Sequence, residues 1–584
     1  MRKVDLKAKP FYLSDEDIKW VEDTIKGMTI EEKIGQLFVI MDKSPDGGKT
    51  AVEIIKKYQP GAARYMEGKA EQVYDQIKMY KEASKVPLLV ACNCESGGDG
   101  AARGGTYIAT QAAAGAVTDS KVAYNAGYVS GKEAAAIGCN WAFGPVSDIF
   151  LNWRNTIINT RSYGNDPELV LEYSRAYIRG LEESKMIACT KHFPGDGVEE
   201  RDQHLLMGVN DQTCEEWDNT FGKVYKGLIE DGIKSIMVGH IALPSYSRKF
   251  VPGIDYSQIK PATLAPELLQ NLLREQLGFN GLILTDASHM LGLTSAMPRK
   301  DQVPNAIAAG CDMFLFFHHP EEDFEYMMNG YKDGIITEDR LEDALRRILG
   351  LKASIGLHKE KEMGEIMPPK EDLNLLGCEE HKNLAIDAAK RSITLVKDTE
   401  NNLPLNPETH KRLKVYYVSN SQAVDMIMGN NSTKDAIREE LEEAGFEVNM
   451  HESYHDLAAK NGHNIQDVIK SMFSESVKEM TSKYDAVIMF VNMKGYCQEN
   501  VVRVQWSIGH SNEIPWYVRE LPTICVSLNQ TTNLFDLPMM KTFINAYGST
   551  RTVIKETIKK IKGEEAFEGK YNDTVFCERW ETRL

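Results

Sequence analysis

The strongest constraint on the fold is a repeating pattern in which a short apolar run is followed by a longer amphipathic stretch. Each run ends near Gly, Pro, Asn, Asp or His, and roughly 20 to 40 residues of amphipathic sequence follow it, as βα units require. We expect strands at residues 36–40, 62–66, 87–92, 141–146, 187–190, 234–238, 282–285 and 312–316.

Eight βα units in succession predict a (β/α)₈ barrel of the TIM type. In that fold the chemistry is supplied from the C-terminal ends of the strands, so the residues that follow each run are informative. They are polar in this chain: Asn93, Glu95, Asp148, Lys191, His192, His240 and Asp286. A doubly wound sheet shares the βα pattern but gathers its ligands at one switch point, so the polar strand ends favour the barrel.

The length of the chain indicates a second domain, because single cores stop growing near about 250 to 300 residues and this chain has 584. Periodicity is lost around Pro368 and Pro369, and apolar runs then resume at 393–396, 413–418, 486–491 and 523–528. These runs predict a smaller α/β domain. We predict the barrel over 1–355, a linker over 356–385 and the second domain over 386–584.

Charge and hydropathy exclude several classes of partner. The chain has 68 Lys plus Arg against 85 Asp plus Glu, a formal charge of -17, which repels nucleic acid and anionic lipid. It contains no long uncharged apolar run, and no apolar segment follows its basic N-terminus. We expect a cytoplasmic protein without a nucleic-acid or membrane partner, acting on a neutral or small anionic substrate.

Cysteine spacing indicates neither a disulfide framework nor a metal centre. The ten Cys are scattered singly apart from Cys92 and Cys94, which form a C-x-C pair. Such thiolates can bind zinc, but no nearby Cys or His supplies the remaining ligands. There is also no Gly-rich phosphate loop. We therefore expect reduced thiols, no metal and no cofactor.

The loop after the fifth run carries one candidate for catalysis. Lys191 and His192 end the strand, Pro and two Gly then break the chain, and Asp202 and His204 follow two residues apart. At that spacing the carboxylate can reach the imidazole, fix its tautomer and stabilise its protonated form. His204 would then be an acid/base on a loop. Spacing alone favours the alternative, a solvated His and Asp on a surface loop.

The seventh run ends in a second candidate, Asp286. A carboxylate at the C-terminal end of a barrel strand is placed to act as a nucleophile or to stabilise a cation. Asp at a strand end is also a common N-cap of the following helix. The segment by itself fits both interpretations equally.

Taken in order, several short motifs make the sequence similar to glycoside hydrolase family 3 across most of its length. The matching segments are 28–37, 143–148, 161–167, 261–264, 277–279, the strand that ends at Asp286, and 309–313. The resemblance implies a (β/α)₈ barrel followed by an α/β sandwich domain. It also implies that Asp286 is the catalytic nucleophile.

The pattern K-H-F-P-G-x-G-x₄-D-x-H resembles the β-N-acetylglucosaminidase branch of that family, in which the His of an Asp-x-His dyad is the acid/base. The resemblance implies that Asp286 attacks the anomeric carbon while His204, held by Asp202, protonates the leaving oxygen. His204 would then activate water for a second displacement, which gives net retention.

The family's substrate contacts carry over onto Arg161, Lys191 and His192, which are expected to donate hydrogen bonds to sugar hydroxyls. A structural ion pair with Asp148 or Asp166 is the alternative for Arg161, and neutralisation of a buried carboxylate is the alternative for Lys191. His240 is a further candidate for the sugar site, although a histidine at a strand end is often a satisfied core residue.

Among the departures from the family pattern, those at Asn93 and Asp196 bear most directly on the site. Asn93 stands where the family usually has Asp; it can donate and accept in the sugar site but lacks the charge that grips a hydroxyl strongly. Asp196 stands where the branch usually has His or Leu, and its negative charge near His204 would raise the pKa of that histidine.

The leading hypothesis is a retaining exo-glycosidase that removes non-reducing terminal β-linked N-acetylglucosamine from small glycans or peptidoglycan fragments. The alternatives are a β-glucosidase-like hydrolase of the same family and a β-N-acetylglucosaminide phosphorylase. A non-catalytic sugar-binding protein is a fourth interpretation, which the presence of Asp286, Asp202 and His204 opposes. The sequence gives no indication of the oligomeric state.

Overall fold

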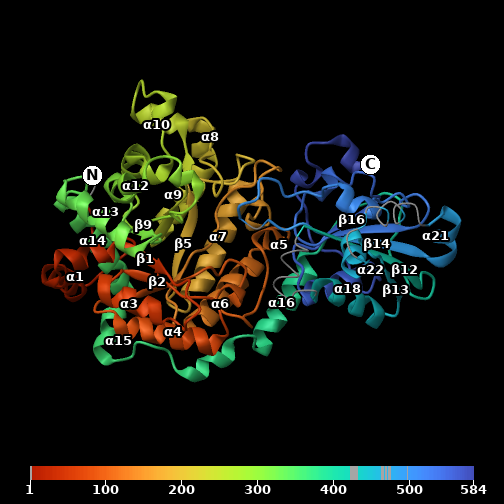
Figure 1. Ribbon diagram of the computed structural model, residues 1–584, viewed down its shortest axis with the longest axis horizontal. Coiled ribbons are helices and arrows are strands. Elements are labelled where there is room, and N and C mark those ends of the chain that lie inside the picture. The colour runs from red at the N-terminus through yellow and green to blue at the C-terminus, as the bar shows by residue number, and fades with distance from the viewer. Residues whose placement is uncertain are drawn as a thin grey trace. The chain divides into compact units, whose positions relative to one another are not determined.

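The computed structural model describes residues 3–420, 432–461, 464, 466, 470, 475–495 and 497–584. The chain divides into two compact units, each built around its own sheet (Figure 1). The first unit comprises Met1–Gln111 and Ser120–Lys382, and the second comprises Ala112–Asp119 and Asn383–Leu584.

A closed ring of parallel strands forms the centre of the first unit. Its strands are β1 (Phe38–Met41), β2 (Ala62–Arg64), β3 (Leu89–Cys92), β4 (Trp141–Ala142), β5 (Ile187–Phe193), β7 (Ser235–Val238), β9 (Leu282–Thr285) and β10 (Phe314–Leu315). They pair in the order β10-β1-β2-β3-β4-β5-β7-β9, and a parallel bridge between Leu284 and Met313 joins the two ends. The predicted (β/α)₈ barrel and its eight strands are confirmed.

Helices follow the strands and cover the outside of the ring (Figure 1). Ser14 and Thr29 begin the first two helices as capping boxes, in which each side chain and a carboxylate three residues later satisfy the exposed backbone N–H groups. The helices are α1 (Asp15–Gly27), α2 (Ile30–Gln36), α3 (Lys49–Tyr58), α4 (Ala70–Ala83), α6 (Lys121–Ala136), α7 (Pro167–Glu182), α8 (Cys214–Asn219), α9 (Phe221–Asp231), α10 (Pro244–Phe250), the π-helical η5 (Glu267–Gln276), α11 (Leu291–Thr294), α12 (Arg299–Ala309), α13 (Pro320–Lys332), α14 (Glu338–Ser354) and α15 (Leu357–Met363).

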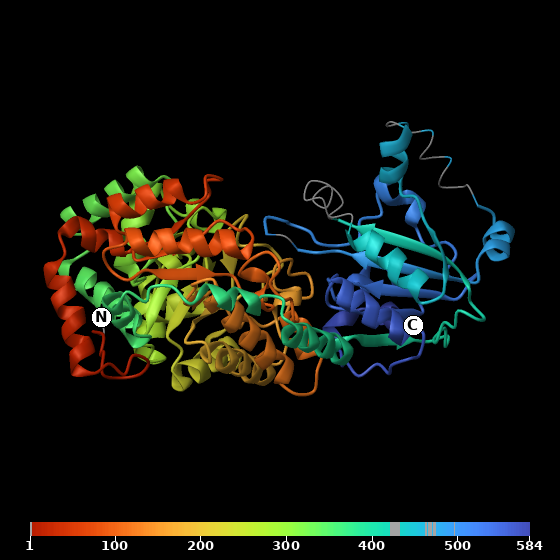
Figure 2. The ribbon, with the colours of Figure 1, turned by 90° about the horizontal axis from the view of Figure 1, so that it is seen from below.

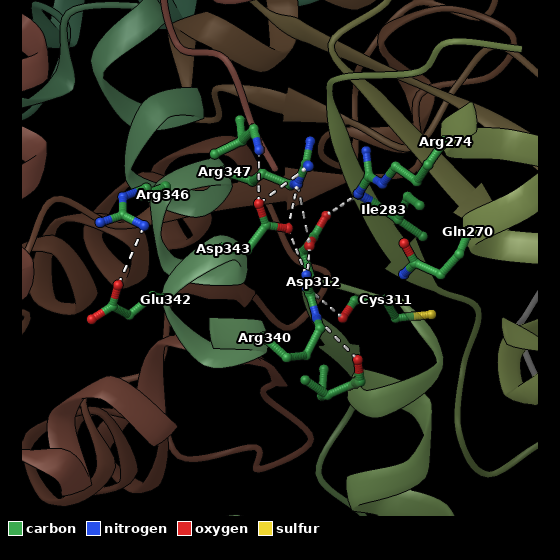
Figure 3. Close-up of polar contacts among 12 residues, drawn as sticks. Gln270, Arg274, Ile283, Cys311, Asp312, Arg340, Glu342, Asp343, Arg346 and Arg347 are labelled. Atoms are coloured by element: carbon green, nitrogen blue, oxygen red, sulfur yellow. Dashed lines mark hydrogen bonds and ion pairs between the residues drawn. The ribbon is translucent and has the colours of Figure 1, made fainter. Parts of the chain in front are cut away.

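A buried ionic cluster holds the seam where the ring closes (Figure 3). Asp312, which lies just before β10, accepts hydrogen bonds from Arg274 of η5 at 2.7 Å, from Arg340 of α14 and from a backbone N–H of β9 at 2.8 Å. Arg340 and Arg347 also pair with Asp343 on the same helix, at 2.7 and 3.2 Å. The cluster lies at the N-terminal end of the strands, the end of a barrel that serves stability.

A mixed sheet forms the centre of the second unit. Within the described residues its order is β11 (Thr394–Asp398), β16 (Thr542–Asn545), β15 (Thr523–Ser527), β14 (Ala486–Asn492), β12 (Arg412–Ser419) and β13 (Glu447–Met450). Only the β11–β16 pair is antiparallel among these strands. Figure 2 shows its teal and blue strands edge to edge. The helices from α16 onward are α16 (Glu379–Ser392), α18 (Ser432–Glu443), α19 (Tyr454–Asn461), α21 (Val477–Lys483) and α22 (Arg551–Ile561). The expected smaller α/β domain is confirmed.

Residues 356–382, which contain most of the predicted linker, pack within the barrel unit. Glu133 of α6 is fully buried there and accepts hydrogen bonds from the Gly377 N–H at 3.1 Å and from His381 Nδ1 at 2.7 Å. The same carboxylate binds the N–H and hydroxyl of Thr106, at 2.7 Å each. These contacts hold the segment around residues 377–381 against α6 in the barrel unit. The predicted boundaries at 355 and 385 stay predictions. In the described part of the chain, no helix is both long and apolar enough to span a bilayer.

Candidate active site at the barrel mouth

The predicted site residues follow neighbouring strands of the ring and therefore lie at one end of it. Asn93 comes directly after β3 and is half-buried. Lys191 and His192 belong to β5, which extends to Phe193 and is longer than predicted. Arg161 ends the short helix η2 (Asn159–Arg161) that follows β4, while His240 and Asp286 follow β7 and β9.

Asp286 presents a largely buried carboxylate at this mouth. Its Oδ2 lies 3.9 Å from His192 Nε2, and its Oδ1 accepts the Ala287 N–H at 2.7 Å. Burial opposes ionisation of the carboxyl, but the charges of His192, His240 and His204, together with the Ala287 N–H, outweigh it and lower its pKa. Asp286 is therefore ionised at neutral pH, the state that a carboxylate nucleophile requires.

Asp202 and His204 form a hydrogen-bonded pair on the loop after β5. Asp202 accepts the His204 ring N–H at Nδ1 across 2.7 Å and the His204 backbone N–H across 2.9 Å. The Asp202 side chain is 1% exposed, whereas that of His204 is 21% exposed. The Leu291 N–H donates to the His204 carbonyl at 3.0 Å, which ties the pair to the segment that follows Asp286. The arrangement leaves His204 Nε2 for proton exchange.

Glu95 is a central residue of the site that the sequence analysis did not select as one. It accepts two hydrogen bonds from Arg161, at 2.9 and 2.8 Å, and pairs with Lys191 Nζ at 2.7 Å. Burial opposes its ionisation, but the charges of Arg161 and Lys191 hold the pKa of Glu95 well below its usual range. The alternative of an ion pair for Arg161 is therefore present, with Glu95 as the partner in place of Asp148 or Asp166.

One carboxylate shared by two cations leaves a net positive charge and unused donors. Lys191 carries three N–H bonds and the Arg161 guanidinium carries five, more than Glu95 accepts. Glu95 thus fixes both side chains, and their other N–H groups can face a ligand. The available sequence signal was the position of Glu95 two residues after Asn93, at the end of the third strand.

Asp148 orients His192. Its fully buried carboxylate accepts from His192 Nδ1 at 2.7 Å and from the backbone N–H groups of His192 and Asp196, at 3.1 and 2.8 Å. This contact fixes the ring so that Nε2 is directed to Asp286. From the sequence, Asp148 was a polar strand-end residue and a possible ion-pair partner of Arg161; its contact with His192 was not predicted.

Asp196 and His192 share Asp148 as a partner, because both of their backbone N–H groups donate to its Oδ1. The Oδ1 of Asp196 accepts from Asn155 at 2.9 Å and from the Gly197 N–H at 2.6 Å, and its Oδ2 lies 3.4 Å from Gln203 Nε2. Burial, followed by the charge of Asp148, raises the pKa of Asp196 to about 7. The charged neighbours that act on Asp196 are Asp148 and His192.

His240 is fully buried, and both of its ring nitrogens have protein partners. Nδ1 lies 2.9 Å from the Thr263 hydroxyl, and Nε2 lies 3.0 Å from the Ala287 carbonyl. Burial lowers the pKa of His240. These contacts make the ring a support for the backbone beside Asp286, and its predicted contact with sugar stays a prediction. No set of three or more His, Cys, Asp or Glu in the described segments is arranged to hold a metal ion.

Comparison with known proteins shows which family the chain matches. Residues 29–351 match the glycosyl hydrolase family 3 N-terminal domain. A protein of Cellulomonas fimi named beta-N-acetylglucosaminidase/beta-glucosidase is 37% identical over 587 residues, covering 100% of both chains. A beta-hexosaminidase of Chromobacterium violaceum is 34% identical over 203 residues, which cover 35% of this chain and 53% of that protein.

Solved structures show the same architecture. A structure titled beta-glucoside phosphorylase BglX is 34% identical, with a TM-score of 0.90 and coverage of 99% of both chains. A glycoside hydrolase family 3 beta-N-acetylglucosaminidase from Paenibacillus is 23% identical with a TM-score of 0.76, covering 93% of this chain and 98% of that one. At that identity the second likeness concerns the fold alone.

Proposed function

Because this chain belongs to glycoside hydrolase family 3, we propose that it is a retaining exo-glycosidase that removes terminal β-linked N-acetylglucosamine from small glycans or peptidoglycan fragments. The observation that carries the proposal is the pairing of two groups at one barrel mouth. One is the ionised Asp286, and the other is His204 with its Nδ1 bound to the buried Asp202.

In the first step Asp286 attacks the anomeric carbon and forms a covalent bond to it. The bond from that carbon to the leaving oxygen breaks, and the oxygen takes a proton from His204 Nε2. Asp202 stabilises the protonated imidazole before the transfer and holds the ring in position during it. The products of this step are a glycosyl ester of Asp286 and a free alcohol.

In the second step the now neutral His204 takes a proton from water, and the water oxygen displaces the Asp286 carboxylate from the anomeric carbon. Two inversions at one carbon give net retention. A histidine thus replaces the acidic member of the usual carboxylate pair. Arg161, Lys191 and His192 would donate hydrogen bonds to the sugar hydroxyls, which rejects epimers that leave these donors unpaired.

Phosphorolysis is the second candidate, and the full-length likeness to a structure titled beta-glucoside phosphorylase favours it. In that reaction phosphate replaces water as the second nucleophile and the product is a sugar 1-phosphate. A neutral imidazole repels the incoming dianion less than a carboxylate base does. A glucoside is the corresponding alternative for the sugar, since the full-length relative's name contains both activities.

The test is a matched pair of substrates, aryl β-N-acetylglucosaminide and aryl β-glucoside, each with and without inorganic phosphate. The proposal expects preference for the acetamido sugar, a β-configured product by NMR at early times, and loss of turnover in His204→Ala. Preference for the glucoside, or sugar 1-phosphate as the main product, would replace it with the corresponding alternative. A barrel that binds these sugars without turning them over would be a sugar-binding protein.

A further inference from the structure

Three basic side chains lie around the part of the barrel mouth that the sugar-binding groups do not use. Lys43 follows β1, His289 follows β9 and His318 follows β10. These strands are consecutive in the ring, in the order β9, β10, β1. Glu95, Arg161 and Lys191 belong instead to β3, β4 and β5 or to the segments after them.

These three side chains differ from the other basic groups of the mouth in their contacts. Lys43, His289 and His318 are exposed, and none of their side-chain nitrogens has a hydrogen bond or an ion pair with another described residue. Arg161 and Lys191, in contrast, share Glu95. The donors of the three are therefore available to a ligand.

The three side chains form one electrostatic cluster with the catalytic pair. Burial lowers the pKa of His289, the charges of Lys43 and His204 lower it further, Asp286 raises it and His318 lowers it. The geometric basis is the strand order, because the three side chains follow β9, β10 and β1, which are neighbours on one side of the ring. The one carboxylate among these groups is Asp286, which faces the anomeric carbon in the proposed mechanism and therefore does not pair with the three basic side chains.

The cluster lies where a leaving group would be. The acid/base must touch the glycosidic oxygen, so the group beyond that oxygen is the leaving group. The backbone hydrogen bond from Leu291 to His204 brings the acid/base to the segment after β9, which also carries His289. The sugar donors lie across the mouth on β3 to β5, which leaves the β9–β10–β1 side for the leaving group.

We propose that Lys43, His289 and His318 form a subsite for an anionic group next to His204, either a carboxylate carried by the leaving group or a free oxyanion. This inference rests on the proposed function. On a chain with a net charge of -17, the average field repels anions, so a local set of unpaired basic donors is needed to bind one. A bound anion would also oppose the burial and the charges of Lys43 and His204 that lower the pKa of His289.

The experiment compares two aryl glycosides that differ only in a ring carboxylate or the matching carboxamide. The readout is the ratio of their kcat/KM values in the native chain and in Lys43→Gln, His289→Gln and His318→Gln. We expect the native chain to prefer the carboxylate, and each variant to reduce that ratio by up to about tenfold, the value of one charge-assisted hydrogen bond. Lys332→Gln, at the far end of α13, is the charge-matched control.

A second arm measures binding of inorganic phosphate by calorimetry, because this readout does not depend on turnover. Phosphate binding that Lys43→Gln weakens, with a ratio near one for the glycosides, identifies the free oxyanion as the ligand. A ratio near one that no variant changes, together with no phosphate binding, overturns the inference. If neither glycoside is turned over, the proposed function fails while phosphate binding still decides the subsite.

Discussion

His204 donates its Nδ1 proton to Asp202 across 2.7 Å, and the accepting carboxylate is almost completely buried. The two hydrogen bonds to this carboxylate hold the ring in one orientation, so Nε2 is the nitrogen left to exchange a proton. In the proposed mechanism the loop after β5 supplies both members of the acid/base pair, and the segment after β9 supplies Asp286.

The dyad predicts a dependence on the leaving group. His204→Gln should lower kcat/KM by about 10² to 10⁴ for alkyl glycosides, whose departure needs a proton, and by far less for dinitrophenyl glycosides. Asp202→Asn should show the same trend with a smaller loss. Steady-state kinetics over a series of leaving groups measures this, with His410→Gln in the second unit as the control. Equal losses across the series would mean that His204 does not donate the proton.

Replacing Asp286 is expected to abolish turnover while leaving the protein folded. Asp286→Asn keeps the shape of the side chain and the acceptor for the Ala287 N–H, so the melting temperature should change little. Turnover should fall to background, because an amide oxygen is a poor nucleophile. Thermal melting and product analysis on one preparation give both readouts. Turnover at the native rate would remove Asp286 from the mechanism.

Replacing Glu95 is expected to weaken both substrate binding and the stability of the fold. Glu95→Gln removes the charge that holds Arg161 and Lys191, and it leaves the nearly buried Lys191 ammonium without its counter-ion. Breaking a buried pair by changing one partner costs about 3 to 5 kcal/mol. We therefore expect a lower free energy of unfolding and a higher KM.

The control for that experiment is Glu67→Gln, because Glu67 is a largely exposed carboxylate 3.5 Å from Arg64. Denaturant titration and steady-state kinetics should show little change in this variant. A similar loss in both variants would mean that the position of Glu95 between two cations has no special effect.

Asp196 predicts a pH dependence of stability. Its pKa is about 7 in the folded protein and near the ordinary value in the unfolded chain, so the folded state keeps a proton that the unfolded state releases. The stability that this proton supplies is full below about pH 4 and is lost as the pH rises through about 7. Because Asp196→Asn cannot ionise, it should be more stable than the native chain at pH 8.

The difference should be on the order of a few kcal/mol at pH 8 and should shrink toward pH 4. Denaturant titrations of the native chain and Asp196→Asn across this range measure it, with Asp211→Asn, an exposed position, as the control. A difference that stays constant with pH would show that Asp196 does not titrate near 7.

The sequence predicted the barrel because each strand is a short apolar run bounded by polar or helix-breaking residues, a local property. Neither β13 nor β16 was predicted. β13 alternates half-buried and exposed residues, and β16 has only two apolar residues, Phe543 and Ile544, between polar ones, so neither contains the apolar run that marked the other strands. The helices within 356–382 were missed for a related reason: their packing contacts, such as His381 with Glu133, join residues 248 positions apart.

The same reasoning applies to the site. Motif order predicted His204, Asp202 and Asp286 as site residues, because their spacing along the chain carries the signal. The role of Glu95 depends on Arg161, which lies 66 residues further along the chain, and no local pattern records such a pairing. A charged residue that orients other charged residues becomes visible only when the strands are brought side by side.

Glu133 sets the length of chain that the catalytic unit needs. This buried carboxylate joins Thr106, in the segment between β3 and α6 that also carries Glu95, to Gly377 and His381 near the end of the barrel unit. A fragment that stops at residue 351, where the family match ends, would lack the donors from Gly377 and His381 and leave the buried Glu133 carboxylate with fewer hydrogen bonds. An autonomous catalytic fragment should therefore be cut no earlier than residue 382.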